Sequence, residues 1–307
     1  MKILISGGAG FLGSFLVESL IKEDHDITVV DDFSTVKYHA LPEKVKLIKG
    51  KIESTDLNEK FDYVVHLAAR PSPEDYIQHP VETAMSNSMG TYKMLEITRK
   101  SDGVMVYTSS SEVYGSAEIV PTPETYWGKV NPNGIRSCYD ESKRFSEALI
   151  MSYYREYGLD VRIQRPFNVY GPRLREDGSY GRVVSRFIYQ AIKGEDITIF
   201  GDGNQTRAFL YVDDWVNATL KMMFLKSLKG EVFNVGSNKE MKIIDLANMI
   251  LEMSGSTSKI KFLPPRPDDP PRRAADISKA REKLGWEPKV SVEDGLKKTI
   301  EWFREQL

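Results

Sequence analysis

Short apolar runs alternate with longer amphipathic stretches along the first half of the chain. Buried strands are predicted where the apolar runs fall, at residues 2–6, 27–30, 45–48, 63–67, 104–107 and 161–163. Apolar residues recur at helical spacing between these runs, most clearly over residues 14–22, 87–99 and 139–157. Strands that alternate with helices in this way favour an α/β fold built on a doubly wound parallel sheet.

The chain becomes richer in loops after Pro166. The pattern there predicts a helix at 183–193, a strand at 197–200 and two amphipathic helices at 277–284 and 292–303. A proline-rich tract at 264–271 predicts a rigid, extended segment. We interpret this half as a smaller α/β lobe over the carboxyl ends of the strands, where ligands of doubly wound sheets bind.

Three glycines, Gly7, Gly10 and Gly13, lie between the first strand and the first helix. At this spacing the first glycine permits a tight turn, the second lets the backbone approach a pyrophosphate, and the third lets helix and strand pack closely. Asp31 ends the second strand, where a carboxylate accepts hydrogen bonds from an adenosine ribose. Because a carboxylate also repels a 2′-phosphate, the motif predicts a dinucleotide site that favours NAD over NADP.

This motif and the change in pattern after Pro166 predict two domains. Residues 1–166 are expected to form the NAD-binding domain, with part of 207–236 returning to it. Residues 167–307 are expected to form the substrate-binding lobe.

Composition narrows the class of protein. The chain has 307 residues, of which 41% are hydrophobic and 28% charged, with a net charge of −2. This balance gives no sign of nucleic-acid or membrane binding, and no apolar run approaches the roughly 20 residues that span a bilayer. Cys138 is the only cysteine and the four histidines lack metal-ligand spacing, so we expect a cytoplasmic protein without a disulfide or a metal site.

Tyr139 and Lys143 are four residues apart, so on a helix they project from the same face. A phenol has an ordinary pKa of about 10, and a neighbouring ammonium stabilises its phenolate. Such a pair can take a proton from a hydroxyl while a hydride leaves the same carbon. Ser110 lies in a serine cluster after the strand at 104–107, where its hydroxyl could hold the reacting oxygen of a sugar.

Through these motifs the chain resembles the extended short-chain dehydrogenase/reductase family, the nucleotide-sugar epimerases, dehydratases and decarboxylases with a Rossmann-type sheet. The similarity covers essentially all 307 residues. It implies a NAD that is reduced and reoxidised within one catalytic cycle, and a homodimer built partly on the helix of Tyr139. The cofactor-binding residues that it implies are Gly7, Gly10, Phe11, Leu12, Gly13, Asp31, Asp32, Ile52, Leu67, Ala68, Ala69, Asn87, Tyr139 and Lys143.

Within this family the chain is most similar to the UDP-glucuronate decarboxylase branch, through the block at residues 126–144. The resemblance implies that Tyr139 removes the C4 hydroxyl proton while NAD takes the C4 hydride, and that the C6 carboxylate β to the new ketone leaves as CO2. Glu112 and Arg273 are implied in the C5 chemistry and in holding that carboxylate. The UDP-sugar is implied to contact Ser111, Asn168, Arg182, Arg207, Arg273 and Arg70.

Three alternatives stay open. A UDP-sugar 4-epimerase needs only the Tyr–Lys pair and room for the 4-keto sugar to turn. A 4,6-dehydratase is disfavoured, because Ser111 stands where that branch carries an aspartic acid that protonates the leaving hydroxyl. A non-catalytic NAD sensor is also hosted by this fold, but such sensors tend to lose the Tyr–Lys pair.

Apart from Ser142, a harmless replacement on a helix for a glycine common in the decarboxylases, two residues depart from the pattern of the family. Lys51 stands where an aspartate usually contacts adenine, and Arg70 replaces a small apolar residue in the loop that receives the glucuronate carboxylate. Arg70 either strengthens the binding of that carboxylate, indicates another C6 substituent or nucleotide, or is an exposed loop residue.

Overall fold

The computed structural model describes residues 1–38, 41–176, 182–266 and 269–307. The chain divides into two compact units. The first comprises Met1–Val113, Val130–Pro166 and Val216–Phe233, and the second comprises Tyr114–Lys129, Phe167–Trp215 and Asn234–Leu307. Relative to the division expected from the sequence, residues 114–129 group with the second unit, and the segment that returns to the first unit is Val216–Phe233.

A seven-stranded sheet forms the centre of the first unit, in the order β11-β6-β5-β4-β1-β2-β3. All neighbouring pairs from β6 to β3 are parallel. The doubly wound parallel sheet expected from the sequence is therefore confirmed. Its strands are β1 (Lys2–Ser6), β2 (Asp26–Asp31), β3 (Lys46–Lys49), β4 (Tyr63–His66), β5 (Val104–Thr108), β6 (Asp160–Pro166) and β11 (Glu231–Val235).

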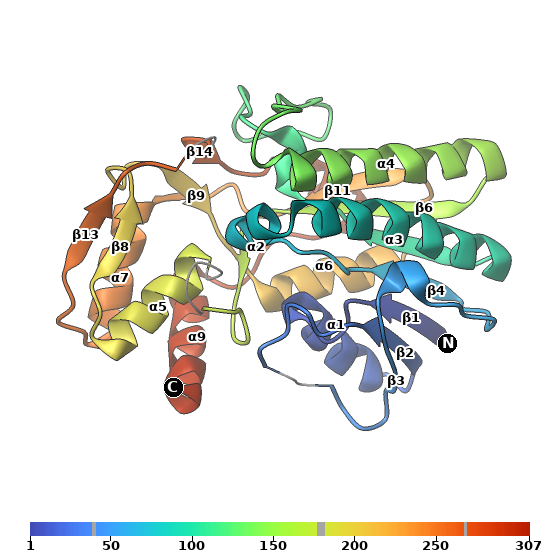
Figure 1. The fold of residues 1–307 in the computed structure, drawn as a ribbon, viewed down its shortest axis with the longest axis horizontal. Helices are drawn as coiled ribbons and strands as arrows, with labels where there is room; N and C mark the ends of the chain where they lie inside the picture. The colour runs from blue at the N-terminus through green and yellow to red at the C-terminus, as the bar shows by residue number, and fades with distance from the viewer. Residues whose placement is uncertain (39–40, 177–181, 267–268) are drawn as a thin grey trace. The chain divides into compact units, whose positions relative to one another are not determined.

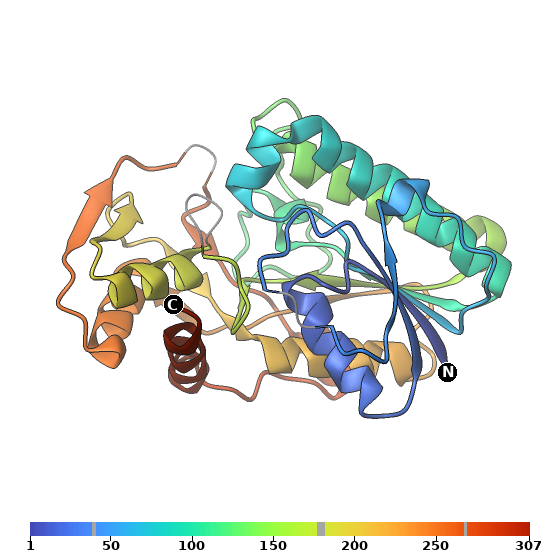
Figure 2. The same cartoon turned by 60° about the horizontal axis from the view of Figure 1, so that its bottom comes forward.

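Helices cover both faces of this sheet. Figures 1 and 2 show α3 (Pro80–Ser101) and α4 (Ser137–Tyr157) side by side on one face, and α1 (Phe11–Ile21) and α6 (Val212–Phe224) on the other. Because both faces of the central strands are covered, strands such as β1, β4 and β5 read as largely continuous apolar runs rather than alternating ones. The core between the sheet and α3–α4 contains fully buried residues from both layers, among them Leu4, Val64, Met105, Met94 and Ile150.

Helix α3 is longer than the predicted span of 87–99. It begins at Pro80, which suits the first helical position because its missing N–H has no partner there. Its early turns bury Thr83 and Asn87, so polar residues interrupt the apolar period that the prediction relied on. Helix α7 (Ile243–Ser254) was not predicted at all, although Ile243, Leu246 and Ile250 follow helical spacing.

The second unit contains three small sheets and most of the remaining helices. Strands β8 (Ile197–Phe200) and β13 (Ile260–Leu263) pair in parallel, and helices α5 (Val183–Lys193) and α7 pack against β8 (Figure 1). Helix α9 (Val292–Gln306) packs against both of these helices. The other elements are β7 (Val169–Tyr170), β9 (Thr206–Ala208), β10 (Leu210–Tyr211), β12 (Glu240–Lys242), β14 (Arg272–Arg273) and α8 (Ser278–Leu284). Residues 267 and 268 of the proline-rich tract lie outside the described residues.

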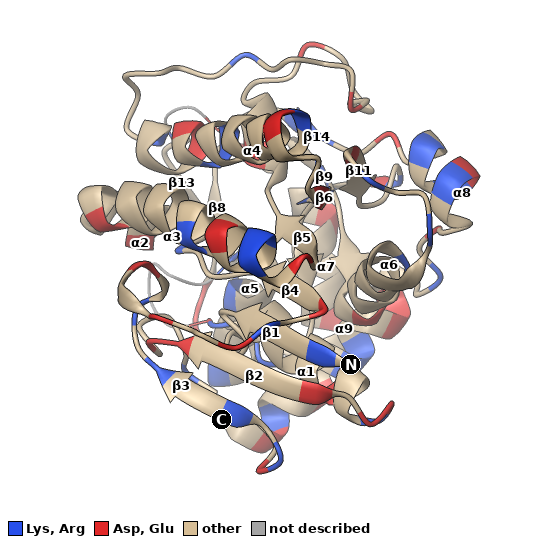
Figure 3. Ribbon diagram, turned by 90° about the vertical axis from the view of Figure 1, so that its right-hand side faces the viewer, with Lys and Arg blue, Asp and Glu red and all other residues tan. Residues whose placement is uncertain are grey.

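Charge is mixed over the chain. Figure 3 shows acidic and basic residues interspersed along its helices and strands, in keeping with the net charge of −2. Over the described ranges, no helix is both long enough and apolar enough to cross a membrane. The same residues contain no group of three or more His, Cys, Asp or Glu side chains that could hold a metal ion.

The first testable prediction concerns the glycine turn. A Cβ on Gly13 would lie 2.3 Å from the carbonyl oxygen of Gly7 and 2.6 Å from the Cα of Gly8, and neither backbone atom can move away cheaply. In the absence of NAD, we expect Gly13→Ala to lower the free energy of unfolding by about 1–3 kcal/mol or more, the usual cost of overpacking. A Cβ on Gly10 would meet only the Gly7 oxygen, at 3.4 Å, so Gly10→Ala is the matched control. Equal melting temperatures for the two variants in calorimetry would contradict this reading.

Candidate active site

The glycine turn joins β1 to α1. Gly7 has φ +74°, and a Cβ there would lie 2.7 Å from the amide nitrogen of Ala68, so both its conformation and its surroundings require glycine. Its N–H donates to the carbonyl of Val30, which ties the turn to the end of β2. Helix α1 begins at Phe11, followed by Leu12, and Gly10 is its N-cap. Because no side chain caps this end, the first N–H groups of the helix can donate hydrogen bonds to an anion.

Asp31 braces this turn from the end of β2. Its carboxylate accepts the N–H of Ala9 at 2.9 Å and the N–H of Phe33 at 2.8 Å. A carboxylate oxygen can accept more than one hydrogen bond, so the role expected for Asp31 with a ribose is compatible with these bonds. The neighbouring Asp32 accepts the N–H of Ser34.

Further residues expected to hold the cofactor come shortly after the strands β4 and β3. Leu67, Ala68 and Ala69 follow β4, which neighbours β1 in the sheet. Ile52 opens the short 3-10 helix η1 (Ile52–Ser54) after β3. A Cβ on Gly10 would meet only the Gly7 oxygen, at 3.4 Å, and the Asp31 carboxylate at the end of β2 bounds the turn. These residues therefore fit a dinucleotide such as NAD.

Tyr139 and Lys143 lie on the first two turns of α4, and both are almost completely buried. The Lys143 ammonium donates to the carbonyl of Thr108, the last residue of β5, at 2.9 Å. It lies 5.9 Å from the centre of the Tyr139 ring. The i, i+4 spacing thus brings the phenol and the ammonium together at the end of β5, beside the serine cluster.

Burial dominates the electrostatics of this pair. It lowers the pKa of Lys143 to about 7, and the nearby Glu147 carboxylate opposes the shift. Burial also lowers the pKa of His66 to about 3, with a smaller contribution from Lys143. His66 is therefore neutral at physiological pH, and its ring nitrogens contact the hydroxyls of Ser6 and Thr91.

A carboxylate held from two sides lies next to Lys143. Ser109 donates to Glu147 at 2.5 Å, and Arg165 from β6 contacts both carboxylate oxygens, at 2.9 and 2.5 Å. Bidentate pairing of this kind fixes a carboxylate in both position and orientation. Sequence reasoning missed Glu147, although its place one turn after Lys143 on the predicted helix could have indicated it.

The serine cluster continues into the 3-10 helix η2 (Ser111–Tyr114). Ser110 is 9% exposed and its hydroxyl accepts the N–H of Glu112 at 3.2 Å, while Ser111 is buried. Glu112 in turn accepts a hydrogen bond from Arg136 at 2.6 Å, and both side chains are only 15% and 12% exposed. Arg136 belongs to the block 126–144 used for the resemblance, but the sequence did not reveal its partner.

Tyr76, in helix α2 (Pro73–Gln78), is a further residue to which the sequence assigned no role. Its ring stacks on Tyr139 with centroids 5.1 Å apart and planes 9° from parallel. Burial raises the pKa of Tyr76 far above its ordinary value, and the Glu112 carboxylate adds to the increase. Among the residues that the structure describes, the buried Tyr76 hydroxyl has no hydrogen-bond partner.

Arg70 is neither exposed nor free of partners. Its side chain is 12% exposed, and it contacts Asp75 at 2.8 Å and Glu82 at 3.2 Å. Glu82 also pairs with Lys51 at 2.6 Å, so the two residues that depart from the family pattern share one carboxylate.

Asn87, one turn along α3 from Thr83, donates to Ser142 of α4 at 2.8 Å.

Three of the residues expected to bind substrate come together in the second unit. Arg207 on β9 and Arg273 on β14 are register partners in a parallel pair, so their side chains leave the same face of the sheet. Arg207 contacts Asp269 at 2.8 Å, and Asn168 donates to the carbonyl of Ala208 at 2.9 Å. Two neighbouring guanidinium groups suit a diphosphate or a carboxylate. Arg182 lies on another element, as the N-cap of α5.

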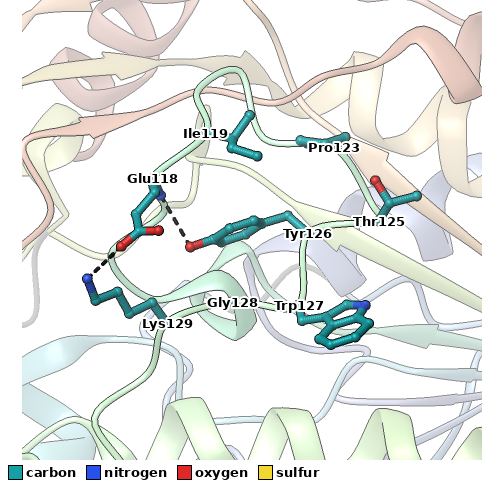
Figure 4. A pocket seen from close by; sticks show the side chains of 8 residues that line it. All are labelled: Glu118, Ile119, Pro123, Thr125, Tyr126, Trp127, Gly128 and Lys129. Atoms are coloured by element: carbon teal, nitrogen blue, oxygen red, sulfur yellow. Dashed lines mark hydrogen bonds and ion pairs between the residues drawn. The ribbon is translucent and has the colours of Figure 1, made fainter.

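The second unit also has a pocket of about 450 Å³ within residues 118–129 (Figure 4). Lys129 pairs with Glu118 at 2.6 Å, and the Tyr126 hydroxyl accepts the N–H of Glu118 at 3.3 Å. Trp127 at its rim is 89% exposed. No residue singled out as a site residue from the sequence lines this pocket, and we assign it no part in catalysis.

The chain belongs to the NAD dependent epimerase/dehydratase family, whose sequence model matches residues 3–236. The resemblance to this family found from the motifs is thereby confirmed. The chain is accordingly an enzyme that uses NAD, as the glycine turn and Asp31 indicated.

Comparison with individual proteins is more specific. The chain is 43% identical over 311 aligned residues to UDP-glucuronic acid decarboxylase 1 of Xenopus tropicalis, an alignment that covers 100% of this chain and 73% of the relative. Among solved structures it is similar to UDP-glucose 4-epimerase of Thermotoga maritima, with a TM-score of 0.94, 36% identity and coverage of 100% and 99%. It is also similar to UDP-glucuronic acid 4-epimerase of Bacillus cereus, with a TM-score of 0.88, 31% identity and complete coverage of both chains.

The charge state of Lys143 gives the second prediction. In the unfolded chain Lys143 keeps its proton up to its ordinary pKa of 10.5, whereas the folded protein releases it near 7. The unfolded state therefore binds more protons between these values, and the stability of the protein without NAD should rise with pH. Lys143→Met removes the contribution of Lys143 to this pH dependence. The melting temperature of the variant relative to wild type should therefore fall as the pH is raised from about 6 to about 9.5. The exposed Lys100→Met is the control, and a pH-independent difference for Lys143→Met would contradict the assignment.

Proposed function

We propose that this enzyme decarboxylates UDP-glucuronate to UDP-xylose through a transient 4-keto sugar. The observation that carries the proposal is the cluster of Tyr139, Lys143, Ser110 and Glu112 at the end of β5, in a chain 43% identical over its whole length to a UDP-glucuronic acid decarboxylase. The cluster contains a base, an ammonium beside it, a hydroxyl for the reacting oxygen and a carboxylate.

The residues of the chain have the following parts in this proposal. NAD, when bound, accepts the C4 hydride and later returns it. Tyr139 takes the proton of the C4 hydroxyl, the Lys143 ammonium favours its phenolate, and Ser110 holds the C4 oxygen. The glycine turn and Asp31 hold the cofactor.

Carbon dioxide loss then follows from the chemistry of the ketone. The C5–C6 bond breaks, and its electron pair becomes an enolate over C5, C4 and the C4 oxygen. Tyr139, now a neutral phenol, and Ser110 donate hydrogen bonds to that oxygen. C5 takes a proton, the ketone is reduced, and Tyr139 returns its proton to the C4 oxygen. Glu112 acts at C5, while Arg207 and Arg273 supply positive charge for the diphosphate and the C6 carboxylate.

The second candidate function is a UDP-sugar 4-epimerase. It is favoured by the likeness to the 4-epimerases of known structure, which include one for UDP-glucuronic acid. Epimerisation uses the same Tyr139, Lys143 and Ser110, but returns the hydride to the other face of C4 and leaves the C5–C6 bond intact. A 4,6-dehydratase is less favoured because Ser111 cannot donate a proton at neutral pH, and a non-catalytic NAD sensor is least favoured because the Tyr–Lys pair is intact.

We also propose that the enzyme is a homodimer. Val81, Met85, Met89 and Tyr92 form a stripe along α3, and Phe145 lies on the adjacent α4, with exposed fractions between 44% and 75%. Apolar residues gathered at this density on two packed helices are typical of a protein interface, and a second copy of the chain can bury the stripe against itself.

A cytoplasmic location is the third part of the proposal. It is supported by the single thiol, Cys138, since a chain that folds without disulfides suits a reducing compartment.

Product analysis tests the proposed reaction. Purified protein incubated with UDP-glucuronate and NAD should release CO2 and UDP-xylose, and Tyr139→Phe should lower this rate by at least about a hundredfold because the base is lost. Tyr153→Phe is the matched control on the same helix, since its hydroxyl contacts Glu96. UDP-galacturonate without CO2 would make the enzyme a 4-epimerase. An unchanged rate in Tyr139→Phe would exclude Tyr139 as the base.

Light scattering after gel filtration tests the dimer. Wild type should have twice the chain mass of 34.9 kDa, and Met89→Asp should halve the observed mass by placing a charge in the apolar stripe. Lys100→Asp, at the exposed end of the same helix, should stay dimeric. A monomeric wild type at micromolar concentration would refute the dimer.

A further inference from the structure

The Glu112 carboxylate has a charged partner to which the reaction as described gives no role. We propose that Arg136 is a positioning residue for decarboxylation, which keeps Glu112 ionised and fixed beside Tyr139. This inference rests on the proposed function, because it gives Glu112 a specific form in the step at C5.

The pair joins two segments that the sequence separates by 24 residues. Glu112 lies in η2 directly after the serine cluster, and Arg136 lies directly before α4. The Arg136 carbonyl accepts the N–H groups of Tyr139 and Asp140, at 3.0 and 3.1 Å, so its backbone starts the helix that carries the base. The backbone of Arg136 therefore holds a fixed position relative to Tyr139.

The surroundings make the charge of Arg136 effective. The contact to Glu112 is 2.6 Å long, and the two side chains are largely shielded from water. The pair also acts on Tyr76, which stacks on Tyr139. The charge of Glu112 raises the pKa of Tyr76 and the charge of Arg136 lowers it. The Asp140 carboxylate, 4.0 Å from the Arg136 guanidinium, is a second negative group near Arg136.

The pairing determines what Glu112 can do. A guanidinium at hydrogen-bond distance favours the ionised carboxylate, and weak solvent screening strengthens the effect. Glu112 thus meets the substrate as a hydrogen-bond acceptor and a base. It has no proton to give to C5 at neutral pH. Loss of CO2 from a carboxylate consumes one proton, so with Glu112 ionised this proton must come from water.

Arg144 provides a matched control. It also ties α4 to this segment, because its guanidinium donates to the carbonyl of Val113 at 2.9 Å, one residue after Glu112. Its guanidinium also pairs with Glu141, at 3.5 Å. Arg144→Gln therefore loosens the same junction while Arg136 keeps its contact with Glu112.

The experiment compares Arg136→Gln, Arg136→Lys, Glu112→Gln, the double variant Arg136→Gln/Glu112→Gln, and Arg144→Gln. CO2 release from UDP-glucuronate should fall by about a hundredfold in Arg136→Gln, and the acid limb of its pH profile should move to higher pH. Arg136→Lys should be intermediate, and Arg144→Gln should keep the wild-type profile. The double variant should be no slower than Glu112→Gln, because the two side chains act as a unit.

Two outcomes would overturn the inference: a wild-type pH profile in Arg136→Gln, or fully additive losses in the double variant. If Arg136→Gln does not fold, Arg136→Lys must show the same displacement of the acid limb to a smaller extent. An unshifted limb in that variant also overturns the inference.

A second readout separates this inference from the proposed reaction. In protein labelled with ¹³C at glutamate carboxyls, the Glu112 signal is identified by its absence from Glu112→Gln. The Glu112 carboxyl group should stay ionised to lower pH in wild type than in Arg136→Gln or Arg136→Lys. If wild type releases no CO2 but this difference is found, the proposed function fails and the ion pair stands. Identical titrations would remove the role of Arg136 whatever the reaction.

Discussion

The ammonium of Lys143 is buried between α4 and the end of β5, and the catalytic arrangement depends on how that charge is accommodated. Burial alone drives the group toward its neutral form. The ammonium donates a hydrogen bond of 2.9 Å to the Thr108 carbonyl. Its nitrogen lies 4.8 and 5.9 Å from the ring centres of Tyr107 and Tyr139. The same contacts that make the cation tolerable also hold it close to the phenol of Tyr139.

Two carboxylates flank this pair, and each is held by an arginine from another segment. Arg165 on β6 fixes Glu147 on the Lys143 side, and Arg136 before α4 contacts Glu112 on the Tyr139 side. A little-exposed carboxylate without such a partner would take up a proton or turn toward water. The arginines thus keep the negative charges of the site in place, and the positive charge of Lys143 is balanced by a fixed Glu147.

Arg70 and Lys51, the two departures from the family pattern, have a common explanation. Both contact Glu82, and Arg70 also contacts Asp75 of α2, so together they link the loop after β4 to α2 and α3. Binding a substrate carboxylate at Arg70 would have to compete with two existing ion pairs. Arg70 thus ties the loop after β4 to α2, the helix that carries Tyr76.

The sequence by itself determined the parallel sheet, the cofactor motif and the position of Tyr139 and Lys143 on one face of a helix. Each depends on local information: buried strands are continuous apolar runs, a glycine turn needs particular backbone angles, and residues four apart share a helix face. It did not determine the extent of α3, whose first turns bury polar residues such as Asn87. Nor did it identify the partners of Glu112, Glu147, Arg70 and Tyr76. Those contacts join segments between 5 and 63 residues apart, and only the packing of strands and helices decides which side chains meet.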